Sequence, residues 1–220
     1  PTPASKVVVA FHGFDRQAKE MENFMPLYDS NTSMLSISLL HHGSSKPLPP
    51  MSPEEPLSPQ VLIDAVESYI GENHARLELL GYSMGARIAL TLFQDFPDKF
   101  SRVIALAPDG LNMGRFYKFI VNTHIGKVTW GLVDKYPKTN RWIIDAMRTL
   151  RVISEHKHHF GRFHTDNPEI RQRVARGWMG HKEFWPEKNK LAKVLNENAN
   201  TEKTGYFIFG SRDKIIPYSW

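Results

Sequence analysis

Five short apolar segments of this chain alternate with segments of helical pattern, and this alternation restricts the possible folds more than any other feature. The first, Lys6–Phe11, is a continuous run rich in β-branched residues without polar alternation, which is typical of a strand buried on both faces. Further strands are expected at 34–40, 77–80, 103–107 and 206–209. Strands that alternate with helices form a mostly parallel sheet with helices on both faces, so the predicted fold class is α/β.

Helix signals separate several of these strands. Ser58 and Pro59 form a favourable N-cap and first-position pair for a helix that Gly71 ends. A second helix is expected at 86–96, where apolar residues lie on nearly every side and a proline follows. The proline-rich stretch 47–59 is expected to be a loop. Ligands of such sheets bind beyond the carboxyl ends of the strands, so the loops that follow the strands should carry the site.

The segment 111–200 has a different character, with helical patterns rich in Trp, Tyr, His and Arg and no run that predicts a central strand. The sequence therefore predicts a first core part at 1–110, an inserted helical region at 111–200 and a second core part at 201–220. The insert holds 17 Lys and Arg against 8 Asp and Glu, but no nucleic-acid-binding signature. This charge favours an anionic small molecule as partner, and no nucleic acid is expected.

Composition excludes several classes of protein. The 41% hydrophobic and 23% charged residues are typical of a globular domain, and the absence of cysteine excludes a disulfide framework, a thiol nucleophile and cysteine-ligated metal sites. No window approaches the ~18 apolar residues of a membrane span. The chain starts without a charged and apolar leader, so any targeting segment is expected to be absent or removed. A cytoplasmic protein is expected, and the oligomeric state is undetermined.

The segment 81–85, Gly-Tyr-Ser-Met-Gly, lies between a predicted strand and a predicted helix. That context is the one a nucleophile elbow requires, with Ser83 held on a strained turn and its hydroxyl turned outward. Glycines two residues before and after the serine are needed because a side chain there would collide with a neighbouring element. The alternative is a chance pentapeptide in an ordinary turn.

Together with the elbow, three other motifs make the chain resemble the α/β-hydrolase superfamily over essentially its whole length. His-Gly-Phe at 12–14 is similar to the family's oxyanion motif, and His-Gly-Ser-Ser at 42–45 is similar to its G-H-G-x-S turn, with His41 where glycine is usual. The segment 210–217 resembles the family's acid loop. The resemblance implies a central sheet of that fold with a helical lid at 111–200.

The same resemblance implies the roles of the site residues. Ser83 would be the nucleophile, and the backbone amides of Phe14 and Met84 would stabilise the oxyanion. Asp213 would orient a catalytic histidine, with Asp109 as the rival acid. His12 is expected to hold its loop rather than act as a base.

The resemblance also places the catalytic histidine some tens of residues after the acid, whereas only seven residues follow Asp213. The other histidines precede Ser83 or lie in 111–200. We therefore expect the base beyond residue 220, and the alternative is a histidine of the helical insert.

Arg87 lies one helical turn after Ser83 and is expected to bind a substrate carboxylate. The segment 81–87 is also similar to the elbow of the pyruvate-eliminating lyase of the menaquinone pathway, and this resemblance implies that Tyr82 and Arg87 help to bind an anionic substrate. The alternative role for Arg87 is a pair with a surface carboxylate.

A histidine-rich stretch at 156–159, with His164 and Asp166, suggests a zinc site by its spacing. A solvated helix face is the favoured interpretation, and neither a metal nor another cofactor is expected.

The motifs together predict a serine hydrolase that cleaves an ester or related carbonyl compound. Anionic substrates are included in this prediction. The first alternative is the pyruvate-eliminating lyase. The second is a ligand-binding protein of the same fold without catalysis.

Overall fold

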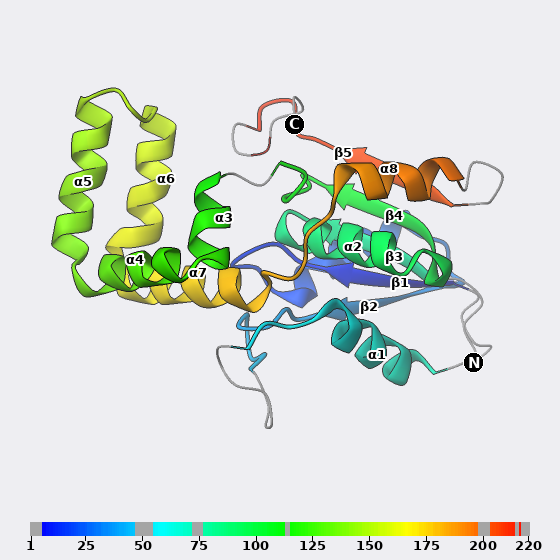
Figure 1. The fold of residues 1–220 in the computed structure, drawn as a ribbon. Coiled ribbons are helices and arrows are strands. Elements are labelled where there is room, and N and C mark those ends of the chain that lie inside the picture. The colour runs from blue at the N-terminus through cyan, green and yellow to red at the C-terminus, as the bar shows by residue number, and fades with distance from the viewer. Residues whose placement is uncertain are drawn as a thin grey trace. The chain divides into compact units, whose positions relative to one another are not determined.

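The computed structural model describes residues 6–46, 55–71, 77–112, 115–197, 203–213 and 216. Its sheet has five strands in the order β2-β1-β3-β4-β5, and every neighbouring pair is parallel (Figure 1). The strands are β1 (Lys6–Phe11), β2 (Thr32–Ile37), β3 (Leu77–Tyr82), β4 (Phe100–Leu106) and β5 (Thr204–Ile208). The α/β class expected from the sequence is confirmed.

The strand register places the loops of interest together. Phe11 is paired with Gly81, and Gly81 is paired with Ala105 on the next strand. The carboxyl ends of β1, β3 and β4 therefore meet at one edge of the sheet. The loops that carry the predicted motifs begin at this edge.

Strand β2 differs from its predicted range of 34–40, because it begins at Thr32 and ends at Ile37. Leu39 and Leu40 are buried, but the backbone has already left the sheet there. The Leu39 amide donates to the imidazole Nε2 of His12 rather than to a neighbouring strand. Burial in a turn gives the same apolar pattern as burial in a strand, which explains the difference.

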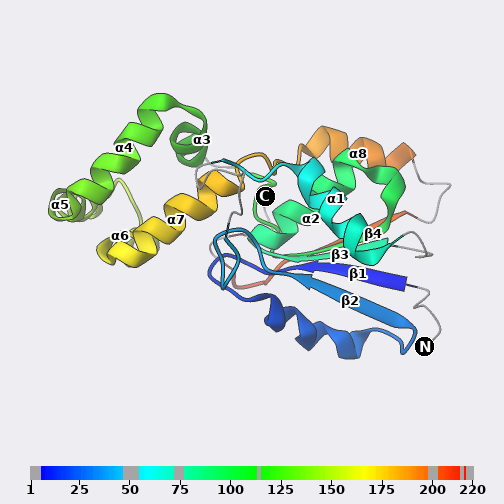
Figure 2. The same ribbon diagram turned by 90° about the horizontal axis from the view of Figure 1, so that it is seen from below.

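Helices cover the sheet on both faces. The helices α1 (Pro59–Ile70), α2 (Met84–Asp95) and α8 (Lys188–Glu197) lie on one face, and the 3₁₀ segment η1 (Ala18–Leu27) lies on the other (Figure 2). A short 3₁₀ turn, η2 (Pro97–Lys99), follows α2. The Ser58 side chain accepts a hydrogen bond from the Val61 amide at 3.2 Å, and Gly71 has φ +77° at the end of α1. The predicted cap residues of α1 are therefore confirmed, while residues 47–54 of the predicted loop lie outside the described part of the chain.

The chain divides into two compact units, one of residues 1–113 and 183–220 and the other of residues 114–182. The second unit consists of α3 (Arg115–Asn122), α4 (His124–Lys135), α5 (Pro137–Thr149), α6 (Glu155–Asp166) and α7 (Pro168–Gly180). It has its own packing, in which the ring of Trp178 lies 5.3 Å from that of Trp130 and 5.1 Å from that of Tyr117. We call it the helical unit, and the first the sheet unit.

The helical unit ends near residue 182, whereas the sequence predicts an insert that extends to residue 200. The reason is that Phe184 and Leu191 pack into the core of the sheet unit. The Glu187 amide also donates to the Gln94 side chain of α2 at 2.6 Å. Helix α8 is therefore part of the sheet unit. Among the described residues, no helix is both long and apolar enough to cross a membrane.

Candidate active site

Ser83 stands on a strained turn between β3 and α2. Its φ is +53° and its ψ is −116°. Residues other than glycine rarely adopt this backbone conformation, which costs about 1–3 kcal/mol. A Cβ at Gly81 would lie 2.4 Å from the Cα of Ala86, and a Cβ at Gly85 would lie 2.1 Å from the carbonyl oxygen of Phe11. Neither site has room for a side chain, so the turn has the geometry of a nucleophile elbow.

Backbone hydrogen bonds hold this turn in place. The Ser83 amide donates to the Leu106 carbonyl at the end of β4, at 2.9 Å. The Ser83 carbonyl accepts from the Ala86 amide at 3.0 Å and from the Asp109 amide at 3.3 Å. The elbow is thus fixed to the loop after β4 as well as to its own helix. Within the described residues, no hydrogen bond of the Ser83 hydroxyl is present.

The loop after β1 lies directly against the elbow. A Cβ at Gly13 would lie 3.4 Å from the Cβ of Ser83 and 2.9 Å from the Tyr82 ring. Phe14 follows this contact in the chain, and Met84 is the first residue of α2, where a backbone amide has no partner inside the helix. The structure therefore brings the predicted oxyanion loop to the predicted nucleophile, and the roles of the Phe14 and Met84 amides stay predictions.

His12 is buried and holds its own loop. Its Nε2 accepts from the Leu39 amide at 3.0 Å, so the proton lies on Nδ1, which donates to the Gly13 carbonyl at 2.8 Å. Burial lowers the pKa of the imidazole, and the nearby His42 lowers it further. A neutral imidazole engaged at both nitrogens is poorly suited to take a proton from Ser83.

His42 belongs to the same loop cluster. Its ring lies 5.3 Å from that of His12 and 5.4 Å from that of Phe14, and its Nδ1 lies 2.9 Å from the Leu40 carbonyl. The turn at 42–45 therefore supports the loop that carries Phe14.

Asp213 lies in a turn after β5. Its amide donates to the Gly210 carbonyl at 3.0 Å, and its carboxylate accepts from the Ile216 amide at 3.0 Å. Other residues of the predicted acid loop, including 214, 215 and 217, lie outside the described residues. The structure places Asp213 at the carboxyl end of the sheet, and its catalytic role stays a prediction.

Asp109 and Arg87 form an ion pair beside the elbow. The guanidinium Nη1 of Arg87 lies 3.8 Å from a carboxylate oxygen of Asp109, and Arg87 is only 1% exposed. A Cβ at Gly110, whose φ is +100°, would lie 2.7 Å from the Cδ of Arg87, so the loop after β4 runs directly over the side chain. The predicted contact between Arg87 and a substrate carboxylate stays a prediction, because the contact described is with the protein.

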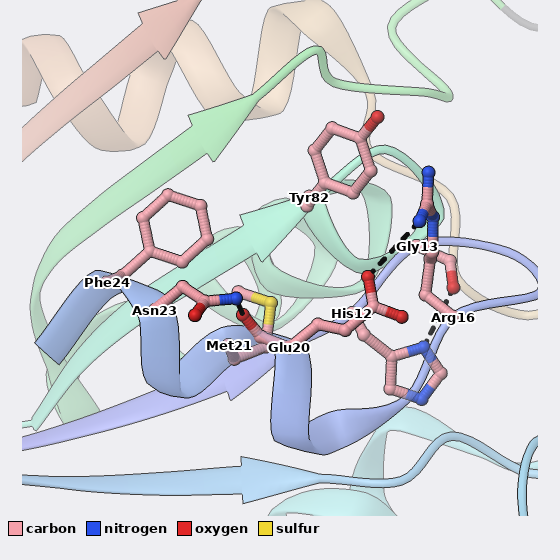
Figure 3. A pocket seen from close by; sticks show the side chains of 8 residues that line it. All are labelled: His12, Gly13, Arg16, Glu20, Met21, Asn23, Phe24 and Tyr82. Carbon is pink, nitrogen blue, oxygen red and sulfur yellow. Dashed lines mark hydrogen bonds and ion pairs between the residues drawn. The ribbon is translucent and has the colours of Figure 1, made fainter.

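A pocket of about 270 Å³ opens beside Tyr82 and Gly13 (Figure 3). Tyr82 is 38% exposed and its ring forms part of the wall. The other lining residues come from the loop after β1 and from η1, and they are His12, Arg16, Glu20, Met21, Asn23 and Phe24.

The η1 residues of this pocket were not among the site residues predicted from the sequence. In the structure, the Glu20 carboxylate accepts a hydrogen bond from the Gln17 amide at 3.1 Å in a capping box at the start of η1. Arg16 also pairs with Glu20 at 3.3 Å. The spacing of Gln17 and Glu20 directly after the His-Gly-Phe motif could have indicated a helical segment beside the site.

The histidine-rich stretch serves helix pairing in the helical unit. Nε2 of His158 on α6 lies 2.7 Å from an Asp145 carboxylate oxygen on α5, and Arg162 donates to both oxygens at 2.6 and 2.9 Å. The hydrogen bond from His158 is the largest cause of the lowered pKa of Asp145, followed by that from Arg162. Among the described side chains, which exclude those of His156 and His164, no group of three or more metal ligands occurs.

Solved structures share this arrangement of sheet and helices. The chain is similar to an α/β-hydrolase enzyme from a Medee basin deep-sea metagenome library, with 16% identity and a TM-score of 0.58 over 98% of this chain and 74% of that one. The protein has the α/β-hydrolase fold. A second match, a hydrolase from Pseudomonas aeruginosa, has 14% identity and a TM-score of 0.54 over 98% of this chain and 75% of that one. Neither a scan against protein-family models nor a search of curated proteins found a match.

Proposed function

We propose that this α/β-hydrolase-fold protein is a serine hydrolase that cleaves an ester or related carbonyl compound through an acyl-enzyme on Ser83. The observation that carries the proposal is the strained backbone of Ser83, with the oxyanion loop so close that a Cβ at Gly13 would lie 3.4 Å from the Cβ of Ser83. A serine that only caps a helix does not need φ +53°. Strain of this kind is stored where the position of one side chain matters.

The proposed reaction has two steps. The Ser83 oxygen attacks the substrate carbonyl while its proton passes to a base, and the amides of Phe14 and Met84 stabilise the negative oxygen of the tetrahedral intermediate. The protonated base then gives its proton to the leaving group as the bond to the carbonyl carbon breaks. Water, activated by the same base, hydrolyses the acyl-enzyme and restores the Ser83 hydroxyl.

The proposal assigns the base to a histidine outside the described residues, in a segment beyond residue 220. His12 lies near Ser83, but both of its ring nitrogens are hydrogen-bonded to backbone groups, which argues against His12 as the base. The acid that orients the base is assigned to Asp213 rather than Asp109. The support for this choice is that Asp109 already balances the charge of the buried Arg87.

The substrate is proposed to be a small molecule that reaches Ser83 at the carboxyl edge of the sheet. A preference for anionic substrates is part of the sequence-based expectation for Arg87. The ion pair with Asp109 weakens this part, since it already neutralises the guanidinium. A comparison of kcat/KM for neutral and carboxylate-bearing esters tests it, and faster turnover of the neutral esters would contradict an anionic preference.

The deciding experiment combines an active-site probe with chemical rescue. A fluorophosphonate should label Ser83 of the 220-residue chain, and added imidazole should accelerate the labelling because it replaces the histidine that we propose beyond residue 220. Ser83→Ala should abolish the labelled peptide in mass spectrometry, whereas Ser36→Ala on β2 should leave it unchanged. Labelling that persists in Ser83→Ala, or a folded protein that imidazole does not activate, would contradict the proposal.

Turnover separates the proposed hydrolase from the lyase. The lyase reaction eliminates pyruvate without an acyl-enzyme, so Ser83 reactivity alone does not exclude it. Hydrolysis of an ester panel with transient acylation of Ser83 supports the hydrolase. Release of pyruvate from the lyase substrate without acylation would favour the lyase.

A further inference from the structure

A turn connects α5 to α6 (Figure 1). Apolar side chains are exposed in this turn. Leu150 is 74% exposed and Val152 is 65% exposed, and the exposed Arg151 stands between them. We call these three residues the hairpin tip. Two aliphatic side chains left in water at one turn forgo the free energy of burial, so their exposure favours a partner that covers them.

The backbone of the hairpin tip is fixed. The Arg151 amide donates to the Arg148 carbonyl at 3.0 Å, and the Val152 amide donates to the Met147 carbonyl at 2.9 Å. These two bonds form a Schellman motif, whose left-handed position is usually glycine and is here Arg151, with φ +57°. The chain thus holds a cation where the fold alone would favour glycine, between two exposed apolar residues.

Side-chain hydrogen bonds hold the two helices of the hairpin together. The hydrogen bonds of Asp145 with His158 and Arg162 join α5 to α6. Trp142, 70% exposed, and Phe163, 63% exposed, lie near the level of this junction. At 1.5 Å per helical residue, Trp142 is about 12 Å from Leu150 along the hairpin.

The charge of the helical unit indicates what kind of partner would cover the tip. Residues 114–182 contain 14 Lys and Arg against 5 Asp and Glu. Next to the tip, residues 148–157 hold Arg148, Arg151 and Lys157 against Glu155, which pairs with Arg148 at 3.5 Å. The net positive charge that remains there attracts polyanions, and the exposed aliphatic side chains determine which kind of polyanion can cover the tip. A nucleic acid would pair with the cations but leave Leu150 and Val152 in water, whereas an anionic lipid surface would pair with the cations and bury both.

We propose that the α5–α6 hairpin docks its tip into the headgroup region of an anionic lipid bilayer. Leu150 and Val152 enter the boundary with the acyl chains, where interfacial segments are buried about 5–10 Å deep. Arg151 contacts lipid phosphates. Trp142 and Phe163 then lie near the outer limit of the headgroup layer, a position that suits aromatic rings with one wet side. The docking is peripheral and does not depend on the chemistry proposed for Ser83.

Sedimentation of the 220-residue protein with vesicles tests the proposal. Vesicles of phosphatidylcholine with about one-third phosphatidylglycerol should bind the protein, and vesicles of phosphatidylcholine alone should bind it at least tenfold more weakly, as expected when several cations each contribute to binding. Leu150→Ser with Val152→Ser should reduce binding to the anionic vesicles at least tenfold. Val61→Ser, which removes an apolar side chain of similar exposure from α1, should leave binding unchanged.

Arg151→Gly separates lipid contact from a structural role. Glycine fits the left-handed position, so the thermal midpoint should not fall, while vesicle binding should weaken about fivefold through the loss of one cation. Ser83→Ala should bind vesicles like the original protein. A folded protein that binds neither vesicle type, tip variants that bind like the original, or tighter binding of RNA than of anionic vesicles would each overturn the proposal.

Discussion

Glycine is required at both elbow positions because a Cβ there would collide with backbone atoms, and not because the turn needs a flexible residue. At Gly85 a Cβ would lie 2.1 Å from the Phe11 carbonyl oxygen, and the three nearest atoms all belong to the backbone of Phe11 and His12, which cannot rotate away as a side chain can. The sequence predicted this restriction at both elbow glycines, because it follows from the tight turn itself. The partner atoms could not be predicted, since they depend on how closely β1 approaches α2.

Gly85→Ala should therefore destabilise the protein by about 3 kcal/mol, the upper end of the usual cost of overpacking. Urea unfolding followed by circular dichroism measures the change. Gly131→Ala is the matched control, because a Cβ there meets nothing within 4 Å and α4 should gain about 0.5–1 kcal/mol from the better helix former. Equal effects of the two variants would contradict the contact at Gly85.

His12 should make the stability of the protein depend on pH. Burial lowers its pKa in the folded state below the ordinary histidine value of about 6.5, so the unfolded chain binds the proton more readily. The stabilising contribution is complete above about pH 6.5 and is lost as pH falls toward the folded pKa. Unfolding free energy measured at pH 7.5 and 5.5 should drop at the lower pH, and His12→Gln should reduce the drop. An unchanged drop in the variant would assign the effect to another group.

At the scale of elements, the sequence predicted those parts of the fold that depend on local pattern. The strand β1 and the cap residues of α1 are found where Lys6–Phe11 and Ser58 with Pro59 indicated. Long-range packing decided the rest. Helix α8 has the same polar helical sequence pattern as the insert, yet its Leu191 packs into the core of the sheet unit. The pocket residues of η1 depend on how that segment packs over the sheet, which local pattern does not determine.

The turn after α5 offers a test of strain at the same scale. Arg151 occupies a left-handed conformation that costs an L-residue about 1–2 kcal/mol relative to a right-handed one. Arg151→Gly should therefore stabilise the helical unit by about 1 kcal/mol, part of the gain being offset by the greater freedom of glycine in the unfolded chain. Thermal unfolding measures this, and Arg148→Gly, inside helix α5, should destabilise instead.

For the whole molecule, the two units have separate cores, one around the sheet and one around Trp130 and Trp178. Separate cores predict two calorimetric transitions rather than one. Gly85→Ala should lower only the transition of the sheet unit, and Arg151→Gly should raise only that of the helical unit. A single transition that both variants shift would show that the units unfold together.

The elbow is held by main-chain atoms: the Ser83 amide on the Leu106 carbonyl, the Asp109 amide on the Ser83 carbonyl, and the close approach of Gly85 to β1. None of the three contacts just named involves the side chain of Tyr82 or Phe14. Their identities can therefore change while Ser83 keeps its place. Such a site is well suited to directed evolution, because new selectivity can be explored at these positions without rebuilding the turn that presents the proposed nucleophile.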